Sequence, residues 1–123
     1  MGVIYHGNYI TWFEVARSDF FKALGYSYRL LESEGVILPV IEVGCRYEKP
    51  ARYDQPVVVK TRVKLFKGVR FGLSYRIYDE TTGELLAEGF THHAFTDKNL
   101  KPVNIKKFNP EIQKSILNAM EVR

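Results

Sequence analysis

The chain has 123 residues, which suits one domain, and 46% of them are hydrophobic, including 8 Phe and 8 Tyr. This composition excludes a disordered chain. The net charge of +4 fits either plain solubility or a preference for anionic ligands. The single cysteine, Cys45, excludes an internal disulfide and a cysteine metal site, and it is expected to be a buried, inert thiol. No apolar run approaches the roughly 20 residues of a membrane span and no signal-peptide pattern is present, so we expect one cytoplasmic domain, residues 1–123.

The first predicted elements are two helices. Asn8 is a candidate helix cap, because its side chain can accept a hydrogen bond from a backbone N–H group of the first turn. From there, apolar residues recur at three-to-four spacing as far as Leu24, which predicts one long helix with a broad buried face. Gly25 is typical of the left-handed residue that ends a helix. A second, short helix is expected from Ser27 to Gly35.

After Gly35 the hydrophobic period changes to two, which predicts strands. Four strands are expected, over residues 36–49 with a kink or bulge at Pro39, 57–66, 69–79 and 85–97. In the second strand, Val57, Val59, Thr61, Val63 and Leu65 are expected to share one face. Lys67-Gly68 predicts a tight hairpin turn, and residues 80–83 predict the next turn. Asn109-Pro110 opens a terminal helix with Ile112, Ile116, Leu117 and Met120 on one side.

Short links between the later strands make them antiparallel neighbours. One face of the expected sheet is apolar, and the first helix has a broad apolar face that must also be buried. The simplest arrangement therefore places the long helix against the sheet, in an α+β fold.

The stretch "GVIYHGNYITWFEVAR" at residues 2–17 resembles the start of the hotdog-fold acyl-CoA thioesterases of the 4-hydroxybenzoyl-CoA thioesterase type. It is most similar to the small bacterial acyl-CoA thioesterases associated with the Tol-Pal cluster. The resemblance continues through "YEKPARYDQPV", "KLFKGVRFGLSYRIYD" and "LLAEGFTHHAFTD", and so covers nearly the whole chain. It implies a hotdog fold, in which an antiparallel sheet wraps around the long helix. It also implies a homodimer or homotetramer with the acyl-CoA at a subunit interface, and thioester hydrolysis without a metal or other cofactor.

Thioester hydrolysis builds negative charge on the carbonyl oxygen, and unpaired N–H groups at a helix start can stabilise that charge. The loop from Tyr5 through His6 and Gly7 to Asn8 ends where the first helix begins. By the resemblance, Tyr5 and His6 belong to the catalytic site, with the backbone N–H of His6 polarising the carbonyl, and Gly7 and Asn8 contact the substrate. The imidazole of His6 either orients a water molecule or only packs and caps the loop.

Members of that thioesterase family carry an aspartate that acts as nucleophile or general base. Its position falls two residues before Met1. The strand that normally precedes the loop is also missing. We therefore expect either an upstream start or a shortened product with an impaired site. Glu14 is the candidate substitute carboxylate on the long helix. The alternative is an ion pair between Glu14 and Arg17 on the helix surface.

Lys64, Lys67 and Arg70 crowd the hairpin between the second and third strands. By the resemblance they are candidates for binding the phosphates of CoA. The alternative is a solvated hairpin. His92 and His93 lie on opposite faces of the last strand, and both are expected to be structural.

The alternative to an enzyme is a catalytically impaired protein that binds acyl-CoA or acyl-carrier protein. An acyl carrier protein is a further candidate partner in either case. The sequence lacks the loop and helix patterns of the hotdog dehydratases. Its basic residues are scattered without any nucleic-acid-binding signature, so nucleic acid is not expected as a partner.

Overall fold

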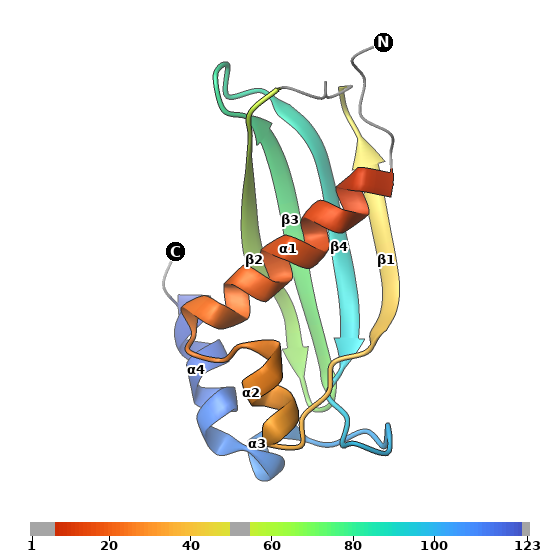
Figure 1. The fold of residues 1–123 in the computed structure, drawn as a ribbon, viewed down its shortest axis with the longest axis vertical. Helices are drawn as coiled ribbons and strands as arrows, with labels where there is room; N and C mark the ends of the chain where they lie inside the picture. Colours follow the sequence, from red (N-terminus) through yellow and green to blue (C-terminus); the bar gives the residue numbers. More distant parts are fainter. Residues whose placement is uncertain (1–6, 50–54, 122–123) are drawn as a thin grey trace.

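The computed structural model describes residues 7–49 and 55–121. A long helix crosses one face of a four-stranded antiparallel sheet, as the sequence predicts (Figure 1). The strands lie in the order β1-β4-β3-β2. In chain order the elements are α1 Gly7–Ala23, α2 Tyr28–Ser33, β1 Val40–Tyr47, β2 Val57–Lys67, β3 Arg70–Asp79, β4 Leu85–Ala94, α3 Ile105–Phe108 and α4 Pro110–Glu121.

The apolar stripe that the sequence predicts packs α1 against the core. Phe13 and Phe21 are completely buried, Ala16 is largely buried, and Trp12 and Phe20 pack at the edge of the same cluster. α1 begins at Gly7, so Asn8 lies inside the first turn and not at the predicted capping position. The helix therefore starts two residues earlier than the sequence suggests.

Both helices at the start of the chain end at glycines. At the end of α1, the N–H of Tyr26 donates to the carbonyl of Phe21, and the N–H of Gly25 donates to that of Lys22. Gly25 adopts a φ of +93° there. This is the Schellman pattern, in which a left-handed residue satisfies carbonyls at the helix end. α2 ends in the same way at Gly35 (φ +82°), and its start is capped by Ser27, whose hydroxyl accepts from the N–H of Leu30. The predicted ends of both helices are confirmed.

The sheet shows the predicted alternation, interrupted by register shifts between Val40 and Glu42, between Val63 and Leu65, and between Ile77 and Tyr78. In β3, the apolar side chains at positions 71, 73, 75 and 77 are fully buried against α1 and the core. In β2 the register shifts between Val63 and Leu65. The extra residue moves Phe66 into the core and takes Leu65 out of the face that it was predicted to share with Val63.

The hairpin turn also lies one residue later than predicted. Lys67 pairs with Arg70, and the turn consists of Gly68 and Val69, with Gly68 at a φ of +62°. Pro39 stands before β1, which begins at Val40, and not within a strand as predicted.

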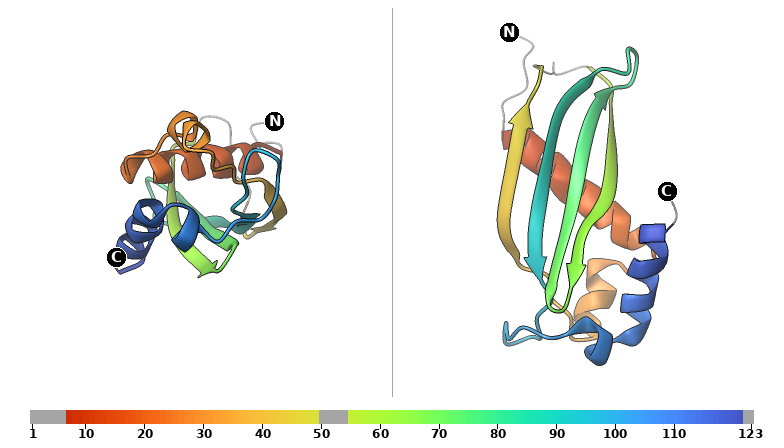
Figure 2. Two further views of the ribbon diagram at one scale, coloured as in Figure 1. Left: turned by 90° about the horizontal axis from the view of Figure 1, so that it is seen from below. Right: turned by 180° about the vertical axis from the view of Figure 1, so that it is seen from behind.

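The remaining helices gather at one end of the sheet, whereas the far face carries none of the described helices (Figure 2). Asn109 caps α4 by accepting from the N–H of Ile112, as the Asn109-Pro110 pair predicts. Ile112 and Ile116 are fully buried, but Leu117 is 39% exposed and does not belong to the buried side. Between β4 and α4, the structure adds the four-residue helix α3, which the sequence did not suggest.

Candidate active site

The start of α1 lies at one end of the sheet, beside the end of β1 (Figure 1). The first N–H groups of a helix have no acceptor inside it, and they lie at the positive end of its dipole. Tyr5 and His6 are outside the described residues, and of Gly7 and Asn8 only the backbone is described. The start of α1 therefore offers backbone donors to an anionic oxygen, while the roles predicted for these four residues stay predictions.

Glu14 lies on the exposed side of α1. Of the two interpretations made from the sequence, the Glu14–Arg17 ion pair is not formed: none of the ion pairs among the described residues joins these two. Arg17 instead turns toward α2, where its Nε donates to the hydroxyl of Tyr28 at 2.5 Å and its guanidinium lies 5.7 Å from the centre of that ring. Burial raises the pKa of Tyr28, although Arg17 opposes the rise. Glu14 is therefore left as an exposed carboxylate near the α1–α2 contact.

A row of buried polar side chains lies beneath α1. The hydroxyl oxygens of Tyr75 and Thr91 are 2.7 Å apart, and Nε2 of His93 lies 2.8 Å from the same Thr91 oxygen. His93 and Thr91 are 1% and 3% exposed. Nothing in the sequence marks Tyr75 or Thr91 beyond their place on the inward side of two strands.

Burial, and then the positive charge of Arg17, lower the pKa of His93 to about 4. Burial raises the pKa of Tyr75 to about 12, although its bond to Thr91 opposes the rise. Both groups are thus neutral at neutral pH. His92, on the opposite face, pairs with Glu42 through Nδ1 at 3.1 Å. The two histidines lie on opposite faces, as predicted, and both are held in structural contacts.

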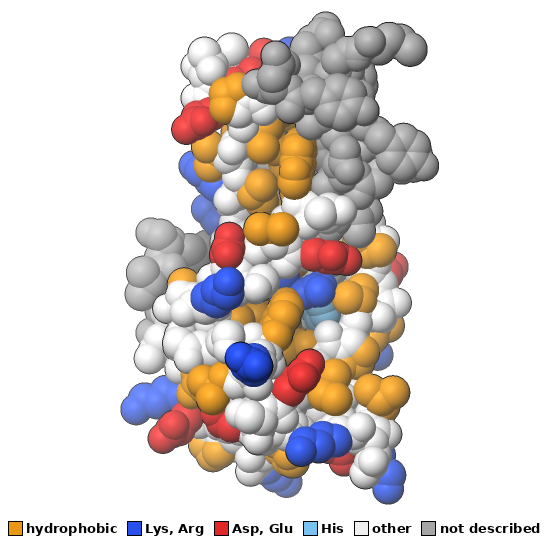
Figure 3. All heavy atoms as spheres, viewed as in Figure 1, with side chains coloured by type: hydrophobic (Ala, Val, Ile, Leu, Met, Phe, Trp, Pro, Cys, Tyr) orange, Lys and Arg blue, Asp and Glu red, His pale blue; other side chains and the backbone are white. Residues whose placement is uncertain are grey.

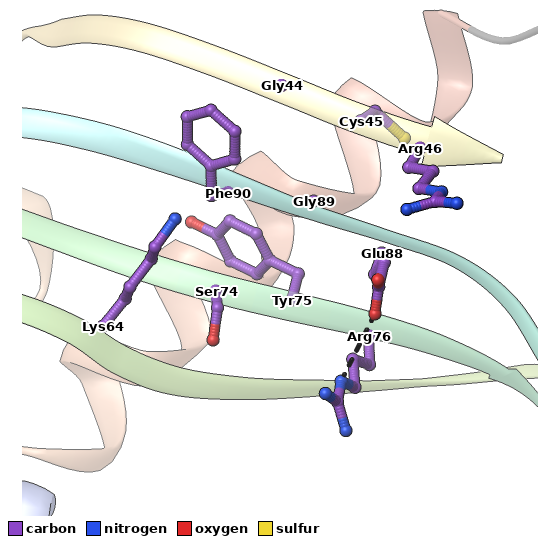
Figure 4. Close-up of a pocket in the computed structure, with 10 residues that line it drawn as sticks. All are labelled: Gly44, Cys45, Arg46, Lys64, Ser74, Tyr75, Arg76, Glu88, Gly89 and Phe90. Carbon is purple, nitrogen blue, oxygen red and sulfur yellow. Dashed lines mark ion pairs between the residues drawn. The ribbon is translucent and has the colours of Figure 1, made fainter.

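Lys64 lies on the face of the sheet that points away from α1 (Figure 4). Its Nζ is 4.4 Å from the centre of the Phe90 ring. Together with Ser74, these side chains line an open hollow of about 530 Å³. Arg76 and Glu88 form an ion pair of 3.6 Å at its other side. The hollow therefore lies across the sheet from the start of α1 in the same chain.

Lys67 and Arg70 are exposed at the hairpin that joins β2 to β3. This hairpin is at the opposite end of the sheet from the first turn of α1 (Figure 1). Within one chain, the structure thus separates the predicted phosphate-binding residues from the predicted carbonyl-binding N–H groups.

A groove of about 480 Å³ runs between α1 and β2. Figure 3 shows hydrophobic side chains (orange) gathered in the upper part of the same face of the molecule. The residues that line the groove are Trp12, Val15, Ala16, Asp19 and Phe20 from α1 and Val57, Val59 and Thr61 from β2. Its apolar lining suits hydrocarbon better than a charged group.

Within residues 7–49 and 55–121, no group of three or more His, Cys, Asp or Glu side chains could hold a metal ion. Burial raises the pKa of the half-buried Cys45 thiol, which fits the inert role expected for it. No helix among the described residues is both long and apolar enough to cross a membrane.

The sequence of this chain matches the thioesterase-like superfamily over residues 1–116. YneP of Bacillus subtilis, a putative acyl-CoA thioesterase, is 36% identical over 112 residues, which cover 90% of this chain and 80% of the relative. YbgC of Escherichia coli O157:H7, an acyl-CoA thioester hydrolase, is 29% identical over 76 residues, which cover 62% of this chain and 57% of the relative.

Among solved structures, a DHNA-CoA thioesterase from Staphylococcus aureus matches with a TM-score of 0.89 and 37% identity. The match covers 99% of this chain and 82% of that one. The likeness therefore extends over the sheet, α1 and the helices at the end of the sheet alike.

Proposed function

Because this chain belongs to the thioesterase-like superfamily, we propose that it hydrolyses acyl-CoA thioesters to free CoA and a carboxylic acid. The observation that carries the proposal is the likeness to the staphylococcal DHNA-CoA thioesterase over almost the whole chain. The start of α1 adds a physical reason, since it presents backbone N–H groups at one end of the sheet.

In the proposed reaction, water adds to the thioester carbonyl, the C–S bond breaks, and CoA leaves as the thiol. The N–H groups at the start of α1, those of His6 and Gly7 included, stabilise the oxyanion that forms in between. Glu14 is the candidate to hold the attacking water. It follows Gly7 by seven residues, which places it on the same side of the helix and about 10 Å further along the axis. Its side chain leans toward the helix start, as helical side chains do, and so reduces that gap.

We further propose a homodimer formed by β1. β1 lies at the edge of the described sheet and carries exposed apolar side chains: Val40, Ile41, Val43 and Tyr47 are 43–64% exposed. If two copies pair antiparallel about Gly44, Glu42 of each copy faces Arg46 of the other on one side of the sheet. On the other side, Val43 faces Cys45. If the register between the two copies shifts by one step in either direction, Glu42 no longer faces Arg46 in either pair. The positions of these two charges therefore favour pairing about Gly44.

Such a dimer changes the position of the predicted phosphate ligands. A twofold axis perpendicular to the sheet turns the second copy end for end, because paired antiparallel strands run in opposite directions. The hairpin of the second copy, with the partner's Lys67 and the partner's Arg70, then lies at the same end as the first turn of α1. A CoA molecule could extend from one to the other, which explains why one chain alone separates them.

Two further expectations concern the substrate and the location of the protein. An acyl carrier protein presents its acyl group on the same pantetheine thioester, so it is the second substrate to compare with acyl-CoA. A cytoplasmic location fits the free thiol of Cys45.

The test is the release of free thiol from a panel of aliphatic and aromatic acyl-CoAs, measured with a thiol-reactive dye on the full chain. We expect turnover with at least one class of acyl group. Binding of acyl-CoA without any thiol release across the panel would contradict hydrolysis and would leave a binding protein.

Two variants then test the roles within the site. Gly7→Pro removes one N–H group at a position where proline fits a helix, so we expect kcat to fall about 100-fold or more if that group contacts the oxyanion. Gly7→Ala keeps the N–H group and is the control. Glu14→Gln keeps the size of the side chain, and a fall in kcat without a rise in KM would support the water-holding role. An unchanged kcat would exclude Glu14 from the chemistry.

A further inference from the structure

One aromatic side chain of α1, Phe13, packs tightly against the sheet. The ring of Phe13 is fully buried and stacks on the ring of Tyr75, with centres 4.6 Å apart and an angle of 11° between the planes. The same ring lies directly over Gly89 of β4. A Cβ atom at position 89 would stand 2.5 Å from two atoms of the Phe13 ring and 2.6 Å from the carbonyl oxygen of Gly44. Only glycine therefore allows the ring to lie at this depth.

α1 has two such anchors. Phe13 follows Gly7 by six residues, or about 9 Å of helix. Phe21, in the second half of the helix, packs against Phe71 with ring centres 5.6 Å apart. A helix that is held at two points tilts when the thickness of one contact changes. A thicker contact at Phe13 would therefore lift the first turn away from the sheet while Phe21 stays in place.

We propose that the contact between Phe13 and Gly89 sets the height of the first turn of α1 above the sheet. Phe13 and Gly89 are then positioning residues for the backbone N–H groups that receive the thioester carbonyl. The kinetic part of this inference rests on the proposed function. A misplacement of about 1 Å at a reacting group can cost about 100-fold in rate, so a contact that fixes the helix height has a direct effect on catalysis.

The first variant is Gly89→Ala. We expect kcat to fall tenfold or more, with a smaller change in KM, because the N–H groups act on the transition state more than on the bound substrate. The matched control is Gly72→Ala. A Cβ atom at position 72 would stand 2.8 Å from Cδ2 of His92, on the face opposite α1. This control should lose stability and keep kcat within about twofold of the wild-type value.

The second variant changes the helix side of the contact, at Phe13. Phe13→Leu should lower kcat more than Phe71→Leu, an equally buried site at the other anchor, because the first turn lies nearer to Phe13 and moves less when the Phe71 contact thins. In the double variant Gly89→Ala/Phe13→Leu, the smaller side chain makes room for the added methyl group. We expect part of the kcat lost in Gly89→Ala to return. Losses that simply add, or equal losses of kcat in the Phe13 and Phe71 variants, would overturn the proposal.

A readout without substrate separates this inference from the proposed function. The backbone amide NMR signals of Gly7, Asn8 and Tyr9 should shift in Gly89→Ala and in Phe13→Leu, and stay in place in Gly72→Ala. If the wild-type chain releases no thiol but these signals move as expected, the positioning contact stands and hydrolysis does not. If the signals do not move, the positioning contact is wrong whatever the enzyme does.

Discussion

His93 lies in the core beneath α1, where it is 1% exposed and Nε2 is 2.8 Å from the hydroxyl oxygen of Thr91. Its pKa lies at about 4 in the folded chain, mainly because burial disfavours the charged form. In the unfolded chain the pKa returns to about 6.5, so the unfolded state binds more protons between these two values. The stability that comes from the neutral histidine is therefore complete above about pH 6.5 and declines as the pH falls toward 4. We expect this one residue to contribute a loss of about 2 kcal/mol between pH 7.5 and pH 5.

The measurement is urea unfolding of the wild type and of His93→Asn at both pH values. The asparagine can keep a bond to Thr91 but does not titrate, so the gap between the two proteins should change by that amount. Tyr75→Phe is the control. It removes the other bond to Thr91 at a cost of about 1 kcal/mol, and that cost should be the same at pH 7.5 and pH 5, because the pKa of Tyr75 is about 12. A gap that does not change with pH for His93→Asn would contradict the assigned environment.

Elements were predictable where the signal is local. Helix periodicity, the glycines at the helix ends and the alternation of β3 are properties of neighbouring residues, and all three are confirmed. The bulge in β2 depends on how that strand pairs with β3, so Leu65 was placed on the wrong face. The candidate site shows the same division. The motif in residues 2–17 marked the start of α1, whereas the contacts of Arg17 with Tyr28 and of Phe13 with Gly89 join distant segments and left no trace in the sequence.

The end of α1 provides a test at this scale. A Cβ atom at Gly25 would meet no other atom within 4 Å, so the cost of adding one comes from the backbone conformation alone. Gly25→Ala should lower the free energy of unfolding by about 1–2 kcal/mol, because an L-residue disfavours the left-handed region. Gly25→Asn should lose less, since asparagine tolerates that region better. Thermal or urea unfolding measures both, and equal losses in the two variants would show that the left-handed conformation is not the cause.

The whole molecule raises the question of what covers the edge of β1. Exposed apolar side chains on an edge strand favour association. The proposed register about Gly44 requires opposite charges at positions 42 and 46 of the two copies. Glu42→Arg alone would place arginine opposite arginine twice in each dimer. Arg46→Glu alone would do the same with glutamates. Two pairs at up to about 1 kcal/mol each should raise the dimer Kd about tenfold or more in either single variant.

The double variant Glu42→Arg/Arg46→Glu restores opposite charges across the twofold axis and should recover most of the affinity. Sedimentation velocity over a range of concentrations measures the Kd, and thermal unfolding shows whether each variant still folds. Because Glu42 pairs with His92 and Arg46 with Glu48 inside one chain, the single variants will also lose those contacts. The double variant separates the loss of contacts inside one chain from the loss of contacts between the two copies. Exchanging the two charges cannot restore both internal pairs, so a recovered affinity must come from the contacts between the copies. Single variants that sediment like the wild type, or a double variant no better than the singles, would exclude this register.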